Sequence, residues 1–457
     1  MLLKNLNPAS GASGNITHFF VIVTMMMFAL GVAAMAALTS NATIAFQSIY
    51  VGVFLVAAWK YPHLATGAII VSSPYILDLS GGVGAKFSIA EVHILLVTVV
   101  VIAKSFVSRR FPSLGKMTGP VLLYMGISTV TAVQGGVDTV DITALVQLAI
   151  FCLITPMLFV SQSTSHRVRN NMMIATGCVC VVLAIFQIIS GPASKVFALG
   201  MHKNNMGQSL AAGLTIWLAT LVDGQSGWWK KFTIPALIIV AVGLMFTLSR
   251  GAWVGAVIAV IVLLLAYQRF RLVWQVSAIV IPVIALMWTL APQQDKDYAT
   301  GFDAAKYDNI KARYSNSEQA LNTFSANPLF GAGISVRKTT DATNLVLTTL
   351  AEGGAFGFVA MFIMFAAYIK LFLYVRRYVP PSDPRFMIVA MSAALMIGRL
   401  AHGQFDHYWV RGASTVAWAS VGMLISIAIE VRQSTGKPRS QSLARGLRGI
   451  QPTRLLR

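Results

Sequence analysis

Basic and amide side chains able to bind an anion stand at separated points of a largely apolar sequence. Arg250 interrupts the apolar stretch LMFTLSRGAWVG, residues 244–255. Lys203 follows His202 in the tetrapeptide HKNN, and a long polar segment at residues 292–353 carries further arginines. A permanent cation in an apolar environment is costly unless an anion or hydrogen-bond acceptors surround it. The position of Arg250 therefore predicts an anionic partner.

The composition predicts that helices in a membrane position these side chains. Hydrophobic residues make up 56% of the 457 residues, charged residues make up 11%, and the mean hydropathy is +0.71. A water-soluble globular protein of this length is far less apolar. We therefore predict an all-α fold, a polytopic helical bundle in a membrane.

About fourteen segments have the ~20 mainly apolar residues that a membrane-spanning helix needs. They lie near residues 17–38, 43–59, 62–78, 90–107, 119–135, 141–161, 171–190, 206–222, 233–249, 251–268, 272–291, 354–375, 385–401 and 412–430. The third and fifth are short enough to be re-entrant, so about 12 to 14 spans are expected. The predicted organisation is about eleven spans in residues 1–291, a helical periplasmic loop at 292–353, the last spans at 354–430 and a basic tail at 431–457.

Basic residues in short loops set the orientation of the spans, because they translocate poorly. The C-terminal tail is rich in Lys and Arg and contains no acidic residue. With this tail in the cytoplasm, most of the 35 Lys and Arg fall on the cytoplasmic side. The net charge of +20 then reflects contact with anionic lipid headgroups rather than binding to nucleic acid.

The same topology brings four polar segments to the outer membrane face. HKNN precedes a span, Arg250 lies between two spans, and residues 292–353 and 399–412 form outer loops. A single arginine at an interface is usually a snorkelling anchor, and an arginine at the bilayer centre costs ~2.5–3.5 kcal/mol. Because four basic segments share one face, we predict a joint anion-binding site rather than four separate anchors.

The larger outer loop is patterned rather than low in complexity. Residues 315–324 and 342–352 are expected to form short amphipathic helices, the second ending at Gly353, with NPLFGAG as a turn between them. The tripeptide DKD at residues 295–297 has the shape of a metal-binding motif, but such tripeptides are common by chance. We expect no metal and no cofactor.

The motifs KNNMG after His202, LSRGAW around Arg250, NPLFGAG and NLVLTTLAEGG all lie within residues 190–375. Together they resemble the O-antigen ligase and Wzy-type polysaccharide polymerase superfamily. The resemblance implies a metal-independent glycosyltransferase of GT-C type in the bacterial inner membrane. It also implies an undecaprenyl-diphosphate-linked glycan as donor, made in the cytoplasm and flipped outward.

With such a donor, Arg250 is expected to bind the leaving diphosphate, assisted by Lys203 and by Arg313 or Arg337. A base must deprotonate the acceptor hydroxyl, and direct attack at the anomeric carbon inverts its configuration. The predicted catalytic residues are Arg250, His407, Asp406 and Glu352. The predicted diphosphate-binding or glycan-binding residues are His202, Lys203, Asn204, Arg313, Arg337, Asn344, His402 and Arg411.

This chain differs from the ligase pattern at the position of the expected base. O-antigen ligases carry a His immediately before the Asn of the large-loop helix, whereas this chain has Thr343 before Asn344. The base is then another residue, or catalysis relies on positioning and leaving-group stabilisation. The candidates are His407 paired with Asp406, which we favour, then Glu352 and His402, and more remotely Glu91 and His93.

Three functions are compatible with these features. A polymerase joins a lipid-linked repeat unit to an acceptor glycan, a ligase transfers finished polymer to lipid A core, and a flippase moves a lipid-linked oligosaccharide. Flippases usually show internal repeats and charged residues along a central cavity, whereas polar groups here gather on one face. The missing His favours a polymerase, with the ligase as the alternative and a chain-length regulator as a further partner.

Overall fold

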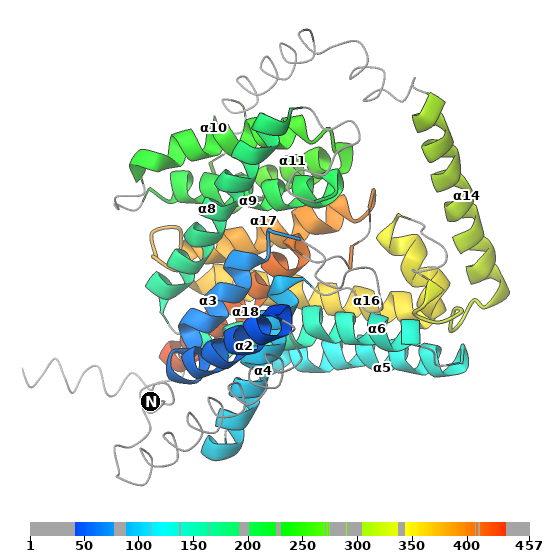
Figure 1. Cartoon of the computed structure of the whole chain (residues 1–457), viewed down its shortest axis with the longest axis horizontal. Coiled ribbons are helices and arrows are strands. Elements are labelled where there is room, and N and C mark those ends of the chain that lie inside the picture. The colour runs from blue at the N-terminus through cyan, green and yellow to red at the C-terminus, as the bar shows by residue number, and fades with distance from the viewer. Residues whose placement is uncertain are drawn as a thin grey trace, which may run out of the picture.

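The protein is described from a computed structural model of the chain (Figure 1). The described residues are 42–76, 88–109, 111–136, 139–163, 165–191, 201–224, 230–269, 271–272, 274, 289, 304–336, 343–406, 408–409 and 412–435. Helices dominate these residues, which confirms the predicted all-α fold.

The helices follow the apolar segments of the sequence closely. The first half of the chain forms α2 (Ala42–Lys60), α3 (Pro62–Ser72), α4 (Ile89–Ser108), the 3-10 turn η1 (Gly115–Met117), α5 (Thr118–Gln134), α6 (Thr139–Ala149), the π-helical turn η2 (Ile150–Ile154), α7 (Thr155–Gln162) and α8 (His166–Ser190). The second half forms α9 (Lys203–Asp223), α10 (Lys230–Phe246), α11 (Arg250–Ala266), α14 (Ala304–Ala326), α16 (Leu345–Tyr378), α17 (Phe386–His402) and α18 (Ala413–Thr435).

Five stretches of the described chain are long and apolar enough to cross a membrane. They are α4, the run from α6 to α7, α8, α16 and α18, and the shorter helices α3, α11 and α17 are also apolar. The predicted span at 17–38, and nearly all of the one at 272–291, lie outside the described residues. The features are those of an integral membrane protein, and the total of about fourteen spans stays a prediction.

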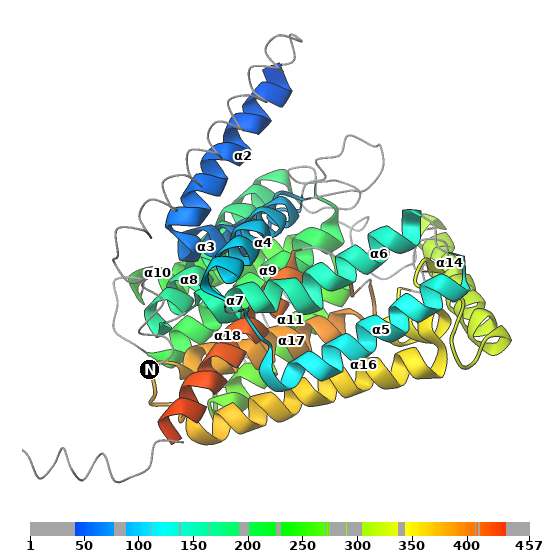
Figure 2. The same cartoon turned by 90° about the horizontal axis from the view of Figure 1, so that it is seen from below.

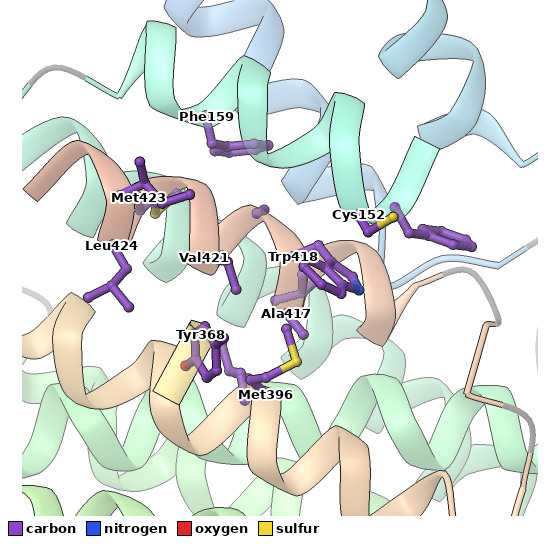
Figure 3. Packing of buried hydrophobic residues seen from close by; sticks show 14 of the residues in the cluster. Cys152, Phe159, Tyr368, Met396, Ala417, Trp418, Val421, Met423 and Leu424 are labelled. Carbon is purple, nitrogen blue, oxygen red and sulfur yellow. The ribbon is translucent and has the colours of Figure 1, made fainter. Parts of the chain in front are cut away.

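The last helix lies at the centre of the molecule. In α18, 83% of the apolar window is buried inside the protein, compared with 33% in α16. Figure 3 shows Phe159 of α7 on one side of α18, and Tyr368 of α16 and Met396 of α17 on the other. Apolar side chains of α16 such as Phe362 are exposed, as expected of a helix that faces lipid.

Two groups of helices surround this centre. In Figure 2, α5, α6 and α16 run side by side along one face. Helices α8, α9, α10 and α11 pack against one another, and α11 packs closely on α17. At the crossing of α11 and α17, a Cβ atom at Gly398 would lie 2.7 Å from Cβ of Ala259, and one at Gly255 would lie 2.9 Å from the Gly398 oxygen. Small residues therefore let the two backbones touch, as is common between membrane helices.

A network of charges ties several segments together at the end of the bundle where α8 and α17 begin. Arg169 of α8 is fully buried, donates to the Ser163 carbonyl at 2.8 Å, and pairs with Glu430 of α18. Arg385, in the connection before α17, pairs with Asp383 at 2.6 Å and with Glu430 at 3.5 Å. These contacts bring the start of α8, the connection before α17 and the end of α18 together.

The large loop and the next span are joined by a kink within one continuous helix rather than by a non-helical connection. The expected helix at 342–352 begins at Leu345, and it runs directly into the span through Gly354, whose backbone is non-helical with φ 58°. The turn NPLFGAG forms as expected and lies against this kink. Preceding it, α14 covers Ala304–Ala326 and so is much longer than the predicted 315–324.

Candidate functional site

The turn between α10 and α11 places Arg250. Leu248 has a left-handed backbone with φ 51°, which lets the chain reverse within three residues after Phe246. Ser249 is the N-cap of α11, and Arg250 is its first residue, with an exposed side chain. The Ser249 hydroxyl donates to Oδ1 of Asn204 at 3.1 Å. The HKNN segment and the first turn of α11, which carries Arg250, are thus neighbours.

His202 begins the second helix at this site. It is the N-cap of α9, and its Nδ1 accepts a hydrogen bond from the Asn204 amide at 3.3 Å. Desolvation by the surrounding protein lowers the pKa of His202, Lys203 and Arg313 lower it further, and Asp406 raises it. Since Nδ1 accepts, the neutral ring carries its proton on Nε2. His202 is therefore a neutral ring with a hydrogen-bond donor at Nε2 rather than a cation.

The turn after α17 completes the same surface. A Cβ atom at Gly251 would lie 3.1 Å from Cδ2 of His402 and from Cβ of Phe405, so this turn packs directly on the first turn of α11. Asp406 follows, with its Oδ2 3.9 Å from Nε2 of His402. Arg313 of α14 donates from Nη1 to the Phe405 carbonyl at 2.8 Å. Residues from α11, α14 and α17 therefore meet here.

A third helix start is bound to this turn. Asn344 is the N-cap of α16, where its Oδ1 accepts from the Leu347 amide at 3.1 Å. Its Nδ2 donates to the Gln404 carbonyl at 3.2 Å, and the Leu345 amide donates to the Gly403 carbonyl at 2.8 Å. The N-termini of α9, α11 and α16, whose helix dipoles favour anions, thus lie around one turn.

Residues 235–362 match the family model described as O-antigen ligase. The matched segment runs from α10 through Arg250 and α14 to the part of α16 just beyond the kink. This confirms the resemblance to the O-antigen ligase and Wzy superfamily, and it supports an activity of the ligase or polymerase type. In general, the O-antigen ligase family implies a lipid-linked glycan and a lipid A core acceptor. The curated proteins contain no match to this chain.

The motifs near the end of the matched segment have a structural role. The Gly333 amide donates to the Glu352 carbonyl at 3.0 Å, and the Ala355 amide donates to the Pro328 carbonyl at 2.8 Å. A Cβ atom at Gly354 would overlap the backbone of Leu329. NPLFGAG and AEGG are therefore the two sides of one backbone contact, and the loop supplies the hydrogen bonds that the kink removes from the helix.

Glu352 lies too deep in the protein to act as a base at the surface formed by Arg250 and Asp406. Its side chain is buried, and it is eight residues beyond Asn344, about 12 Å along the helix axis. The remote alternatives have partners elsewhere: Glu91 forms a capping box with Ser88 at the start of α4, and His93 stacks on Phe54. Of the base candidates, the structure places Asp406 and His402 beside α11, the helix of Arg250.

His407, Arg337 and Arg411 lie outside the described residues. His402 and Arg399, expected in an outer loop, lie instead in the last turn of α17 and are both buried. The sequence analysis missed Ser249 and Gln208, which join or line the site. Gln208 stands one helical turn after Asn204 in a mainly apolar helix, and this i, i+4 spacing of amides is the signal that points to it.

Proposed function

We propose that this protein is a polysaccharide polymerase. It transfers a glycan from an undecaprenyl-diphosphate carrier to an acceptor glycan at the outer face of the membrane, without a metal and with inversion. The observation that carries the proposal is the contact of Ser249 with Asn204, because it joins the starts of α9 and α11 and thereby the cations Lys203 and Arg250. The O-antigen ligase match supports the general class of activity.

The chemistry follows from where charge develops. The acceptor oxygen forms a bond to the anomeric carbon while the bond from that carbon to the diphosphate oxygen breaks, and the electron pair stays on the diphosphate. Two helix N-termini, Lys203 and Arg250 face this growing negative charge. His202 donates a hydrogen bond from Nε2, and Asp406 or His407 takes the proton from the acceptor hydroxyl.

A ligase is the alternative, since its donor is the same and its acceptor is lipid A core. Thr343, where O-antigen ligases have a His, favours the polymerase. The glycan profile of a deletion strain separates the two. Lipid A core that carries one repeat unit indicates lost polymerisation, whereas bare core with accumulated lipid-linked polymer indicates lost ligation. Repeat units retained on the cytoplasmic side would instead indicate a flippase.

The variant Arg250→Ala tests the diphosphate role. The side chain is exposed, so the variant should insert and fold normally, but transfer should fall by about 10²–10³ because a charge that stabilises the leaving group is gone. Arg250→Lys should keep part of the activity, because it keeps the charge and loses the planar fork. Transfer is measured in vesicles with a lipid-diphosphate-linked repeat unit.

Lys231→Ala is the matched control, because Lys231 is an equally exposed cation at the opposite end of α10. It should transfer at the wild-type rate. Near-normal transfer by Arg250→Ala would remove Arg250 from the mechanism.

A further inference from the structure

We propose that His402 is a neutral hydrogen-bond donor whose Nε2–H is given to a water molecule bound between α9, α11 and α17, and that the ring fixed in this way positions the nearby Asp406 carboxylate. The inference rests on the proposed transfer reaction. It makes His402 a positioning residue and assigns the proton-accepting role among the described residues to Asp406.

The hydrogen bonds of Arg399 decide the tautomer of His402. Nε of Arg399 donates to Oγ of Ser414 at 2.9 Å, Nη2 donates to the Tyr408 carbonyl at 2.6 Å, and Nη1 contacts Nδ1 of His402. A guanidinium has donors and no acceptor, so Nδ1 of His402 must accept. In the neutral ring the proton is then on Nε2.

With this tautomer, His402 has no nitrogen available to take a proton. Nδ1 faces a permanent cation, and Nε2 already carries hydrogen. The ring is also buried, with 3% of the residue exposed, beside the charges of Arg399 and Arg313. Adding a second proton would place another cation between these two, so His402 is a donor and Asp406, at 3.9 Å from Nε2, is the carboxylate it faces.

A small cavity provides a hydrogen-bond partner for Nε2 of His402. The cavity of about 30 Å³ lies between α9, α11 and α17, and Gln208, Arg399 and His402 are among its lining residues. Within the described part of the chain, Nε2 of His402 and Oε1 of Gln208 have no hydrogen-bond partner, and Gln208 is 3% exposed. The volume is that of one water molecule, and the two atoms are a donor and an acceptor.

This water links the two halves of the site. It accepts from Nε2 of His402 and donates to Oε1 of Gln208, while Nε2 of Gln208 donates to Oδ1 of Asn205 in the HKNN segment at 3.0 Å. A polar chain thus runs from Arg399 through His402 to the start of α9. With its tautomer and ring plane fixed, His402 occupies one side of the Asp406 carboxylate, 3.9 Å from Oδ2, and leaves the other side for the acceptor hydroxyl.

The experiment compares His402→Gln, His402→Phe and Asp406→Asn in the vesicle assay. A Gln amide places an N–H donor close to the position of the histidine Nε2. We expect His402→Gln to retain transfer within about tenfold of the wild type, with an unchanged pH profile of kcat. His402→Phe and Asp406→Asn should each lose about 10² or more. If His402 were the base, Gln and Phe would fail alike, and this result would overturn the proposal.

A second measurement uses the folded wild-type protein and needs no variant to be active. Nitrogen NMR of histidine-labelled protein, with His402→Gln used only for assignment, should show a neutral His402 with hydrogen on Nε2 across the range in which histidine normally titrates. A proton on Nδ1 or a charged ring would contradict the proposal. If the wild type transfers no glycan, the proposed function fails while this measurement still decides the tautomer.

Discussion

Arg250 and Lys203 each occupy the first position of a helix, so two sources of positive potential coincide at each residue. The side chain contributes a full charge, and the helix dipole contributes the equivalent of about half a charge. Asn344 marks a third helix start nearby. A diphosphate bound here meets fixed backbone donors as well as mobile side chains, which favours a preorganised site over one that assembles around its ligand.

Arg313 provides the contact between α14 and this site. We expect Arg313→Ala to weaken transfer about fivefold, mainly through the KM for the lipid-linked donor, because it removes a charge and the bond to the Phe405 carbonyl. Lys311→Ala removes an exposed cation from the same helix and should leave the KM unchanged. Equal effects in the two variants would mean that general surface charge, rather than this contact, is what matters.

At the scale of elements, the contact between NPLFGAG and the kink of α16 tolerates little change in sequence. Gly354 has a backbone that other residues rarely adopt, and a Cβ atom there would overlap Leu329. We expect Gly354→Ala to lower the free energy of unfolding by about 2 kcal/mol or more. In detergent, the variant should therefore lose soluble protein at a lower temperature than the wild type. The measurement is made in parallel on Gly353→Ala.

Gly353 is the control because it precedes Gly354 directly, and a Cβ atom there would meet nothing within 4 Å. Its replacement should be close to neutral. If both variants unfold at the same temperature, the kink is not held by the contact described.

Hydropathy predicted most of the helices well, because the described helices other than α14 lie within apolar runs of the sequence. It did not predict the kink, because two glycines after an amphipathic stretch are typical of a helix end. The helix continues past Gly354 only because the NPLFGAG loop supplies hydrogen bonds there. Arg399 was expected in a loop for a similar reason. Its acceptors, Ser414 and the Tyr408 carbonyl, follow later in the chain, so the sequence alone gave no sign that a buried arginine could be satisfied there.

At the scale of the whole molecule, polar groups gather at two opposite ends of the bundle. One end holds Arg250, Asn344 and Asp406, and the other holds the pairing of Arg169 with Glu430. The proposed reaction requires the first end to face outward, where flipped lipid-linked glycans are found. Loop charge predicts the same orientation.

Cysteine labelling tests this orientation. Asn327→Cys, in the exposed loop before the kink, should react with a membrane-impermeant maleimide added to intact spheroplasts, whereas Arg377→Cys, at the end of α16, should react only after permeabilisation. Background labelling should be low, because the native cysteines Cys152 and Cys180 are buried and the half-buried Cys178 lies within the apolar helix α8. The reverse pattern would place the candidate site in the cytosol and end the proposed function.

The backbone contact between Gly255 and Gly398 limits how this molecule can move. Where two helices touch without side chains between them, neither can slide or rotate without first separating, so α11 and α17 should behave as one rigid body throughout turnover. A lipid-linked glycan is bulky and has to enter and leave. We therefore expect the opening that admits it at the periphery, for example at α14, which packs on α16 and is held to the turn after α17 by an exposed hydrogen bond from Arg313.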